Sequence, residues 1–332
     1  MSPVPGGGAD PLELMTAYQH SAIVAAAVRT GVADAIAHRA RTAQEIAAER
    51  ALHAPSVRKL LGAMTALGLA AREGGRHRLT RAAAELASDH PRTLATIVEK
   101  EWFFYKAWGG LDDAVRDGHA QIAPWRERLA ADPGQSERFL GALDDLAERF
   151  GGELPALAGL ERGGRLLDVG GGAGSHSAFL AGAVPGLEPT VLDLPEVEGV
   201  LRARHPELPF VAGDLDLPRF GRPDGETWDA VLVANILHDH PADRCRGLVA
   251  QAAGLLRAGG TLLVYEWVLD ESLDAPPAVA LFSVMMLVEN EGGAAYPGSQ
   301  VSGWLEEAGL RDVEIRRGVG PIAVVRGRAP EG

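Results

Sequence analysis

The chain has 332 residues, of which 46% are hydrophobic and 23% are charged, and its formal net charge is -13 at pH 7. This length and balance predict a globular protein of about two domains. The excess of 45 acidic over 32 basic side chains argues against nucleic acid as the main partner, because phosphate binding needs concentrated Lys and Arg. The single cysteine, Cys245, excludes a disulfide within one chain and a multi-cysteine zinc site.

The termini and apolar stretches carry no export or membrane signal. Residues 1–11 are rich in Gly and Pro and predict a disordered tip. No basic region is followed there by an apolar run, so the segment does not predict a signal peptide. The apolar stretch 278–288 is shorter than the about 20 residues that a membrane span needs. We therefore expect a soluble, cytoplasmic protein with no membrane partner.

The N-terminal part of the chain predicts a mostly helical domain over residues 12–100. Its expected elements, in chain order, are helices over 12–29, 33–38, 42–50 and 55–66 and a hairpin over 69–79. Thr42 and Glu45 fit a capping box. Gly74 and Gly75 suit the hairpin turn, and Thr80 is placed to cap another helix. Helices followed by such a hairpin are typical of a winged-helix domain.

A winged-helix domain can bind DNA, or it can serve as a dimerisation or scaffold module. The candidate recognition helix, 55–66, carries only Arg58 and Lys59 as charged residues. Together with the acidic balance of the chain, this favours the dimerisation or scaffold interpretation and predicts no nucleic-acid partner.

Residues 101–157 predict a helical linker with an unusual concentration of aromatic side chains. Aromatic residues make up 5% of the chain but fill five of the seven positions from 102 to 108. Core packing explains most such clusters, and a pocket for a flat ligand is the alternative, with Trp102, Phe103 and Trp108 as lining residues. Phe139 and Leu143, one helical turn apart, are further candidates for this lining.

From residue 158 to 332, short apolar runs alternate with helical segments. The expected strands are 166–169, 189–192, 208–211, 230–233 and 261–265, and the expected helices are 177–182, 197–204, 242–256 and 298–309. Segments 313–316 and 322–326 are expected to finish the domain as an antiparallel hairpin. This alternation predicts an α/β fold, a Rossmann-like doubly wound parallel sheet.

A glycine-rich loop follows the first of these strands and opens a helix. Its sequence reads Asp168-Val-Gly170-Gly-Gly172-Ala-Gly174, and glycines allow a tight turn and a close approach of backbone to ligand. The dinucleotide fingerprint G-x-G-x-x-G is only partly met, because Ser175 stands at the third position. The loop also contains no Lys or Arg, so nothing in it favours a pyrophosphate.

Asp168, Asp193 and Asp214 each fall near the carboxyl end of an expected parallel strand, where open α/β sheets bind ligands. Asp193 can accept hydrogen bonds from both ribose hydroxyls, and Asp214 can accept one from the exocyclic amine of adenine. These roles predict a ligand with ribose and adenine but no phosphate. S-adenosyl-L-methionine is such a ligand, and its positive charge suits a pocket lined by carboxylates.

His238 follows the fourth strand on the same rim of the sheet and is the candidate general base. Histidine titrates near neutral pH and can take a proton from a phenol as a methyl group arrives. Glu266, at the end of the fifth strand, can orient the imidazole. A metal site at His238, Asp239 and His240 is an alternative, but the spacing is not diagnostic and we expect no metal.

The apolar helix 278–288 carries Phe282, Met285 and Met286. Methionines on helices are usually core fillers, but they also suit a flat aromatic substrate. Phe282 and Met286 are therefore candidates for the substrate pocket.

Taken together, these residues resemble a known family. The motifs are LLDVGGGAGSH, VLDLPEV, AGDL, NILHDHP, LRAGGTLLVYEWVLD and FSVMMLVENEGGAAYPGSQVSGWLEEAGL. The chain resembles the two-domain, S-adenosylmethionine-dependent O-methyltransferases of the plant caffeate type, in their bacterial small-molecule branch. The resemblance covers nearly the whole chain, and its motifs are specific as a set.

The resemblance implies a metal-independent enzyme that forms a homodimer, with the partner chain reaching toward the active site. His238 would be the general base, Glu266 would position it, and Met286 and Asn290 would face the acceptor. The implied cofactor-binding residues are Asp168, Gly170, Gly172, Gly174, Asp193, Leu194, Asp214, Leu215, Asn235 and Asp239. Among these, the resemblance implies that Asp193 binds the ribose.

The chain departs from the plant pattern at three positions. Ala234 replaces a lysine, His240 replaces a tryptophan, and Ala295 replaces a second glutamate that acts on the base. Glu289 or Glu291 is a possible substitute for that glutamate, and the spacing does not decide between them.

The expected reaction is methyl transfer to a phenolic hydroxyl of an aromatic small molecule, in natural-product or pigment biosynthesis. Methylation of an activated ring carbon is the nearest alternative. A ligand-sensing regulator and a nicotinamide-dependent oxidoreductase are more distant ones. The missing basic recognition surface disfavours the regulator, and the imperfect fingerprint disfavours the oxidoreductase.

Overall fold

A computed structural model describes residues 10–332, and the chain divides into two compact units between Phe104 and Tyr105. The first nine residues, most of the tip expected to be disordered, lie outside the described residues. Asp10 and Pro11, the end of that tip, instead begin the first helix. The Asp10 carboxylate caps this helix by accepting a hydrogen bond from the N–H of Leu12 at 2.9 Å.

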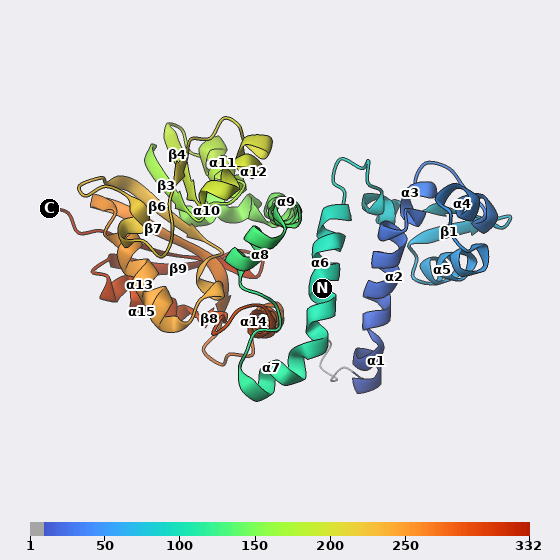
Figure 1. The fold of residues 1–332 in the computed structure, drawn as a ribbon. Helices are drawn as coiled ribbons and strands as arrows, with labels where there is room; N and C mark the ends of the chain where they lie inside the picture. Colours follow the sequence, from blue (N-terminus) through green and yellow to red (C-terminus); the bar gives the residue numbers. More distant parts are fainter. Residues whose placement is uncertain (1–9) are drawn as a thin grey trace. The chain divides into compact units, whose positions relative to one another are not determined.

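The first unit consists of short helices and one hairpin (Figure 1). Its elements are α1 (Pro11–Thr16), α2 (Tyr18–Arg29), α3 (Val32–Ala35), α4 (Ala43–Arg50), α5 (Ala54–Ala66), β1 (Ala70–Glu73), β2 (Arg76–Leu79), the 3-10 helix η1 (Arg81–Leu86) and α6 (Ala95–Ala107), which runs past the unit boundary. The single helix expected over 12–29 is two helices that meet at Ala17. The helix expected after Thr80 is a 3-10 helix, and the Thr80 hydroxyl donates to the carbonyl of Gly68 at 2.8 Å instead of capping it.

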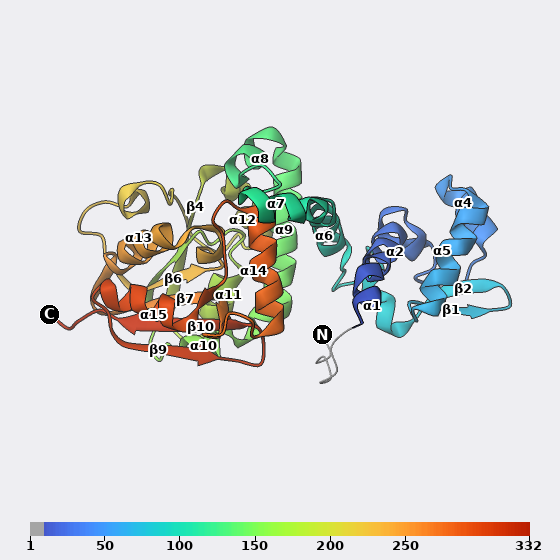
Figure 2. The same cartoon turned by 90° about the horizontal axis from the view of Figure 1, so that it is seen from below.

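The winged-helix pattern forms as the sequence predicts. Thr42 and Glu45 make both bonds of the capping box, at 2.8 and 3.3 Å, so α4 begins where the motif indicates. The hairpin strands β1 and β2 pair antiparallel, with Ala70 opposite Leu79 (Figure 2). Apolar residues of α3, α4, α5 and the hairpin share one buried core.

The second unit begins with helices and continues with a mixed sheet. The helical elements before the sheet are η2 (Trp108–Gly110), α7 (Leu111–Asp117), α8 (Trp125–Ala131), α9 (Pro133–Phe150), η3 (Gly151–Glu153) and α10 (Leu154–Ala158). The strands are β3 (Gly164–Val169), β4 (Leu187–Asp193), β5 (Phe210–Ala212), β6 (Trp228–Ala234), β7 (Leu256–Leu269), β8 (Tyr296–Pro297), β9 (Arg311–Arg317) and β10 (Ile322–Arg328). The helical segments between them are α11 (Ser175–Ala183), η4 (Pro195–Val197), α12 (Glu198–Arg204), η5 (Pro218–Gly221), η6 (Leu237–Asp239), α13 (Ala242–Ala253), α14 (Pro277–Glu289) and α15 (Gly298–Glu307).

The main path of the sheet has the order β5-β4-β3-β6-β7-β10-β9. Strands β3 to β7 run parallel, and β10 is antiparallel to both β7 and β9. The chain moves outward from β3 to β5, then returns to place β6 on the other side of β3. This reversal creates the switch point at which doubly wound sheets bind ligands, beside the carboxyl ends of β3 and β6.

Helices cover both faces of the sheet (Figure 1). One buried core lies between the sheet and α13 and α15, and it includes Leu167 and Leu262. The other lies against α10 and α11, and it includes the neighbouring residues Leu166 and Leu263. Because successive strand residues point to opposite faces, β3, β6, β7 and β10 each contribute to both cores and contain short apolar runs.

The boundaries of the sheet differ from expectation at β7. The helix expected over 242–256 ends at Ala253, and Leu256 already pairs with Trp228 of β6. The strand then continues past the expected end at residue 265 to Leu269, where it pairs with the short strand β8, which the sequence did not predict. Among the described residues, no helix combines the length and hydropathy of a membrane span.

Candidate active site

The glycine-rich loop after β3 adopts the backbone that its sequence predicts. Gly170, Gly172 and Gly174 have φ values of 69°, 57° and 96°, in the left-handed region that favours glycine. A Cβ atom on Gly170 would lie 2.5 Å from the side chain of Ile236, whereas a Cβ on Gly172 would meet nothing within 4 Å. The loop therefore packs closely on one side and leaves backbone open on the other.

Asp168 lies beneath this loop rather than at its surface. Its side chain is 0% exposed, and one carboxylate oxygen accepts a hydrogen bond from the Ser177 hydroxyl of α11 at 2.8 Å. Burial raises the pKa of Asp168 to about 7, and the Ser177 bond only partly opposes this effect. The contacts of Asp168 thus join the end of β3 to the start of α11.

Asp193 and Asn235 follow the parallel strands on either side of β3. The Asp193 carboxylate accepts hydrogen bonds from the N–H of Gly172 at 2.9 Å and from the N–H of Leu194 at 2.7 Å. Asn235 has a left-handed φ of 55°, and its buried side-chain oxygen has no hydrogen-bond partner among the described residues. A buried polar atom without a partner points to a ligand. These groups offer acceptor oxygens of the kind that the hydroxyls and amine of S-adenosylmethionine need.

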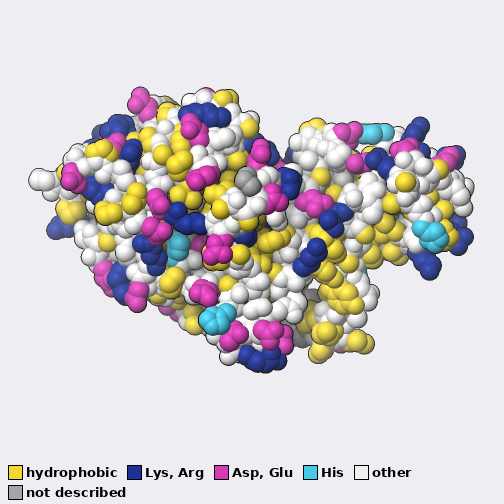
Figure 3. Space-filling view, in the orientation of Figure 1, with side chains coloured by type: hydrophobic (Ala, Val, Ile, Leu, Met, Phe, Trp, Pro, Cys, Tyr) yellow, Lys and Arg dark blue, Asp and Glu magenta, His cyan; other side chains and the backbone are white. Residues whose placement is uncertain are grey.

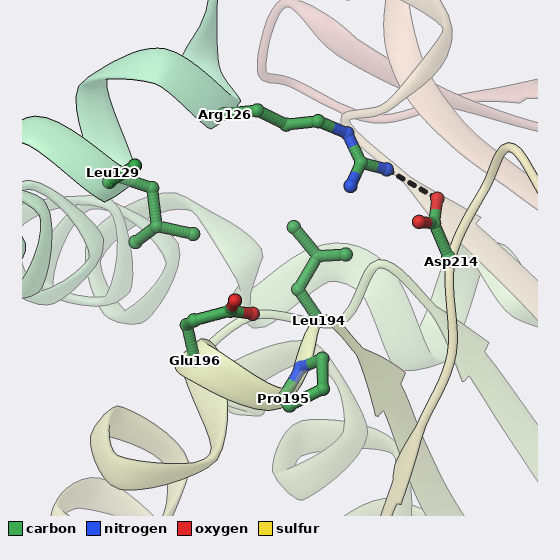
Figure 4. A pocket seen from close by; sticks show the side chains of 7 residues that line it. Arg126, Leu129, Leu194, Pro195, Glu196 and Asp214 are labelled. Carbon is green, nitrogen blue, oxygen red and sulfur yellow. Dashed lines mark hydrogen bonds and ion pairs between the residues drawn. The ribbon is translucent and has the colours of Figure 1, made fainter.

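A cavity of about 250 Å³ opens beside Asp214, after β5. Figure 4 shows it between α8, which supplies Arg126 and Leu129, and the segment that follows β4, which supplies Leu194 and Pro195. Leu194 and Asp214, two of the residues predicted to bind the cofactor, both line this cavity. The side chain of Leu215 lies against the large core of the sheet.

His238 and Glu266 form a buried pair at the ends of β6 and β7. Their side chains are bonded through His238 Nδ1 and Glu266 Oε1 at 2.6 Å. The same carboxylate accepts hydrogen bonds from the N–H groups of Leu237 at 3.0 Å and Trp267 at 2.8 Å. Glu266 is only 1% exposed and His238 8%. The ring orientation of His238 is therefore fixed by a carboxylate that is itself held by the backbone.

Several charges act on the His238 imidazole. Burial alone would lower its pKa, but the nearby carboxylates outweigh burial and raise the pKa to about 9. Glu266 has the largest opposing effect, and Asp239 and Glu289 add to it. Asp239 lies 3.6 Å from Nε2, the ring nitrogen that does not bind Glu266.

Helix α14 places aromatic and apolar side chains next to His238 and Glu266, and we call this surface the aromatic wall. The His238 ring meets Phe282 edge to face with 4.8 Å between ring centroids, and Phe282 stacks on Trp267 at 4.3 Å. The Asn290 amide, just after α14, donates to Asp239 at 2.7 Å and lies 3.9 Å from the sulfur of Met286. The structure thus brings the predicted acceptor residues Phe282, Met286 and Asn290 to one region around His238 and Asp239.

Among the other predicted lining residues, Phe139 is linked to this region, because the Arg128 guanidinium lies 5.5 Å from its ring centroid and pairs with Glu289. Trp102 and Phe103 belong to the first unit, and Trp108 belongs to the second, where it begins η2. Phe139 packs on Trp125, with ring centroids 5.4 Å apart, and Leu143 is partly exposed. The roles of these five residues in the substrate pocket stay predictions.

Sequence reasoning missed three residues of this site. Trp267 stacks on Phe282, Arg128 of α8 pairs with Glu289 at 3.2 Å, and Arg126 pairs with Asp214. The position of Trp267 directly after Glu266 was an available signal. Arg126 and Arg128 carry no such signal, because their partners lie 88 and 161 residues away in the sequence. The described residues contain no group of three or more His, Cys, Asp or Glu side chains that could hold a metal ion.

Comparison with known proteins decides the family. Residues 108–311 match the model of the O-methyltransferase domain, and residues 12–89 match that of the O-methyltransferase dimerisation domain. The chain belongs to the O-methyltransferase family. The second match supports a homodimer.

Relatives match over nearly their whole length. The 3-hydroxy-5-methyl-1-naphthoate 3-O-methyltransferase of Streptomyces sahachiroi is 31% identical, over 94% of this chain and 92% of its own. The tetracenomycin polyketide synthesis 8-O-methyl transferase TcmO of Streptomyces glaucescens is 28% identical, over 98% and 97%. An O-methyltransferase family protein from Burkholderia thailandensis has a similar structure, with a TM-score of 0.84, 25% identity and 97% of each chain covered.

These matches confirm the expected reaction class, cofactor and fold. The enzyme is an S-adenosylmethionine-dependent O-methyltransferase. Its fold combines a Rossmann-like catalytic domain with an N-terminal helical dimerisation domain. The individual site residues and the acceptor are not decided by the matches.

Proposed function

We propose that this O-methyltransferase methylates a phenolic hydroxyl of an aromatic small molecule, with His238 as the general base. The observation that carries the proposal is the buried bond of 2.6 Å between His238 and Glu266, next to the aromatic wall of Phe282 and Trp267. The two Streptomyces relatives, one of them named for a naphthoate acceptor, support an aromatic substrate in natural-product biosynthesis. A cytoplasmic location stays a prediction.

His238 is arranged to remove one proton. Because Nδ1 faces the Glu266 carboxylate, this nitrogen carries a hydrogen and the lone pair of a neutral ring resides on Nε2. S-adenosylmethionine supplies a methyl group on a sulfonium, which leaves as a neutral thioether. The protein therefore has to align the acceptor oxygen and accept its proton, and Nε2 is the atom that accepts it.

The pKa of His238 suits a phenol. Phenols such as the tyrosine side chain have a pKa of about 10, and the pKa of His238 is raised to about 9. Proton transfer between groups of similar pKa has little thermodynamic cost. An imidazole with its ordinary pKa would be a weaker base for the same proton, but a larger fraction of it would be neutral, and so able to accept that proton, at pH 7.

The cofactor site that we propose lies along the ends of β3 to β6. Asp193 would accept hydrogen bonds from the ribose hydroxyls, Asp214 would accept one from the adenine amine, and the backbone at Gly172 would be free to contact the ligand. Asn235 would accept a hydrogen bond at its buried oxygen, which has no partner among residues 10–332. Asp168 would support the site indirectly, by holding the start of α11 through Ser177.

The test is the substitution His238→Ala, assayed with S-adenosylmethionine and a panel of phenolic acceptors. We expect turnover to fall by about 10²- to 10⁴-fold, the usual contribution of a general base. Calorimetric binding of S-adenosylhomocysteine should stay nearly unchanged. Unchanged turnover would contradict the base role, and NMR of the product would show whether the new methyl group is bound to oxygen or to carbon.

A further inference from the structure

We infer that Arg126 is a positioning residue for the adenine end of the cofactor. Its guanidinium holds the Asp214 carboxylate in one orientation, so that the second carboxylate oxygen is presented to the exocyclic amine of adenine. The inference rests on the proposed assignment of the adenine site to Asp214. It adds a residue from α8, a helix to which the sequence analysis gave no cofactor role.

Arg126 reaches from α8 across the cavity to the loop after β5. Figure 4 shows its side chain extended along the cavity, with the guanidinium at the Asp214 carboxylate. One nitrogen, Nη2, donates both to Asp214 Oδ1 and to Asp216 Oδ2, the latter at 3.2 Å. A single cation therefore holds two carboxylates of one turn.

The bonds to Asp214 converge on one of its oxygens. Oδ1 accepts from Arg126 and also from the N–H of Asp216, at 2.8 Å. Within residues 10–332, no donor is bonded to Oδ2. Two donors on the same oxygen fix the rotation of the Asp214 carboxylate before any ligand binds. A further hydrogen bond to Oδ2 therefore costs little additional side-chain entropy.

The charges of the turn keep Asp214 ionised. Burial by itself would raise the pKa of Asp214, but the N–H of Asp216 and the Arg126 guanidinium outweigh burial and lower it. Arg244 fixes the turn from the other side, because it donates to Asp216 at 2.6 Å and to the carbonyl of Leu215 at 2.5 Å. An ionised carboxylate can only accept hydrogen bonds, which matches an amine donor.

The rest of the cavity is suited to a flat heterocycle. Leu129 and Ala130 of α8 line one side, and Leu194 and Pro195 line the other, next to the carboxylate of Glu196 (Figure 4). These apolar side chains can contact the two faces of a purine ring, while its polar edge meets Asp214. The ion pair between Arg126 and Asp214 thus connects α8 to the residue that we assign to the polar edge of the purine.

The test compares two nucleosides that differ only at the purine edge. S-adenosylhomocysteine carries the 6-amine, and S-inosylhomocysteine carries a carbonyl in its place. Calorimetry would measure both affinities for the wild type, Arg126→Gln, Asp214→Asn and the control Arg246→Gln. Arg246 matches Arg126, since it also pairs with two carboxylates, Asp243 and Glu307, and is 51% exposed against 50%.

We expect Arg126→Gln to lower the affinity for S-adenosylhomocysteine about tenfold or more, which is the usual effect of losing a charge-assisted hydrogen bond. Binding of S-inosylhomocysteine should change little, so the preference for adenine falls, as in Asp214→Asn. The positioning role would be overturned if Arg126→Gln lowered the affinity for both nucleosides equally, or if the ratio of the two affinities did not change. A wild type that binds neither nucleoside would instead contradict the proposed adenine site itself.

Discussion

Glu289 is one of the carboxylates that raise the pKa of His238. It is buried at the end of α14, where Arg128 holds it at 3.2 Å. Glu291, the other glutamate that the sequence offered in place of the missing second carboxylate, is exposed and pairs with His119 at 3.0 Å. Glu289 is therefore the better candidate for that role.

The substitution Glu289→Gln tests this assignment. Removing its charge lowers the pKa of His238, because a neighbouring anion stabilises the imidazolium. Since only neutral His238 accepts a proton, kcat/KM rises with pH as His238 loses its own proton. We expect this rise to move to lower pH in the variant, as measured by pH–rate profiles.

Glu291→Gln is the matched control, because it removes the same charge two residues away. Its pH–rate profile should overlay that of the wild type. If Glu289→Gln gave no shift, or if both variants shifted equally, the charge of Glu289 would have no specific effect on the base.

Two glycines of the cofactor loop allow a second residue-level comparison. Both Gly170→Ala and Gly172→Ala place a Cβ on a left-handed backbone, which costs about 1–2 kcal/mol. Only at Gly170 does the new atom also clash, with Ile236 at 2.5 Å. We expect urea denaturation to show the larger loss of unfolding free energy for Gly170→Ala. Equal losses would mean that Ile236 moves aside.

At the scale of elements, strand ends were the most predictable part of the site. Short apolar runs followed by glycine or by Asp193 mark β3 and β4 correctly, because buried parallel strands are apolar on both faces. Since such strands end at one edge of the sheet, the sequence also indicated that His238 and Glu266 meet, and the structure shows them bonded.

Contacts that depend on packing between distant elements could not be predicted in this way. β7 runs on to Leu269 because β10 and β8 pair with it, and this pairing brings Trp267 to Phe282. No local pattern encodes such pairing. The same holds for the ion pairs of α8, in which Arg126 and Arg128 find partners far along the chain.

At the scale of the whole molecule, the dimerisation domain carries an uncovered apolar surface. Helix α1 and the start of α2 expose Leu12, Leu14, Met15 and Tyr18, and Met15 is 74% exposed. Figure 3 shows hydrophobic side chains gathered there. Clustered exposed apolar side chains mark association surfaces, and these four lie within the residues that match the dimerisation domain.

We expect Met15→Glu to weaken the homodimer, because a charge at an apolar interface loses its hydration on association. Sedimentation analysis over a range of concentrations would show a larger fraction of monomer. Val319→Glu is the control, since Val319 is 98% exposed but lies outside residues 12–89. A dimer that is equally stable in both variants would exclude this surface from the interface.

The base and the wall beside it come from different parts of the fold. His238 and Glu266 follow the central strands, whereas Phe282 and Met286 belong to α14 and Asn290 directly follows it. An exchange of residues 277–288 for the corresponding segment of a relative would replace Phe282 and Met286 and would leave His238, Glu266 and Glu289 in place. If the proposed site is correct, acceptor preference can change through this one contiguous segment while the groups that act on the proton stay the same.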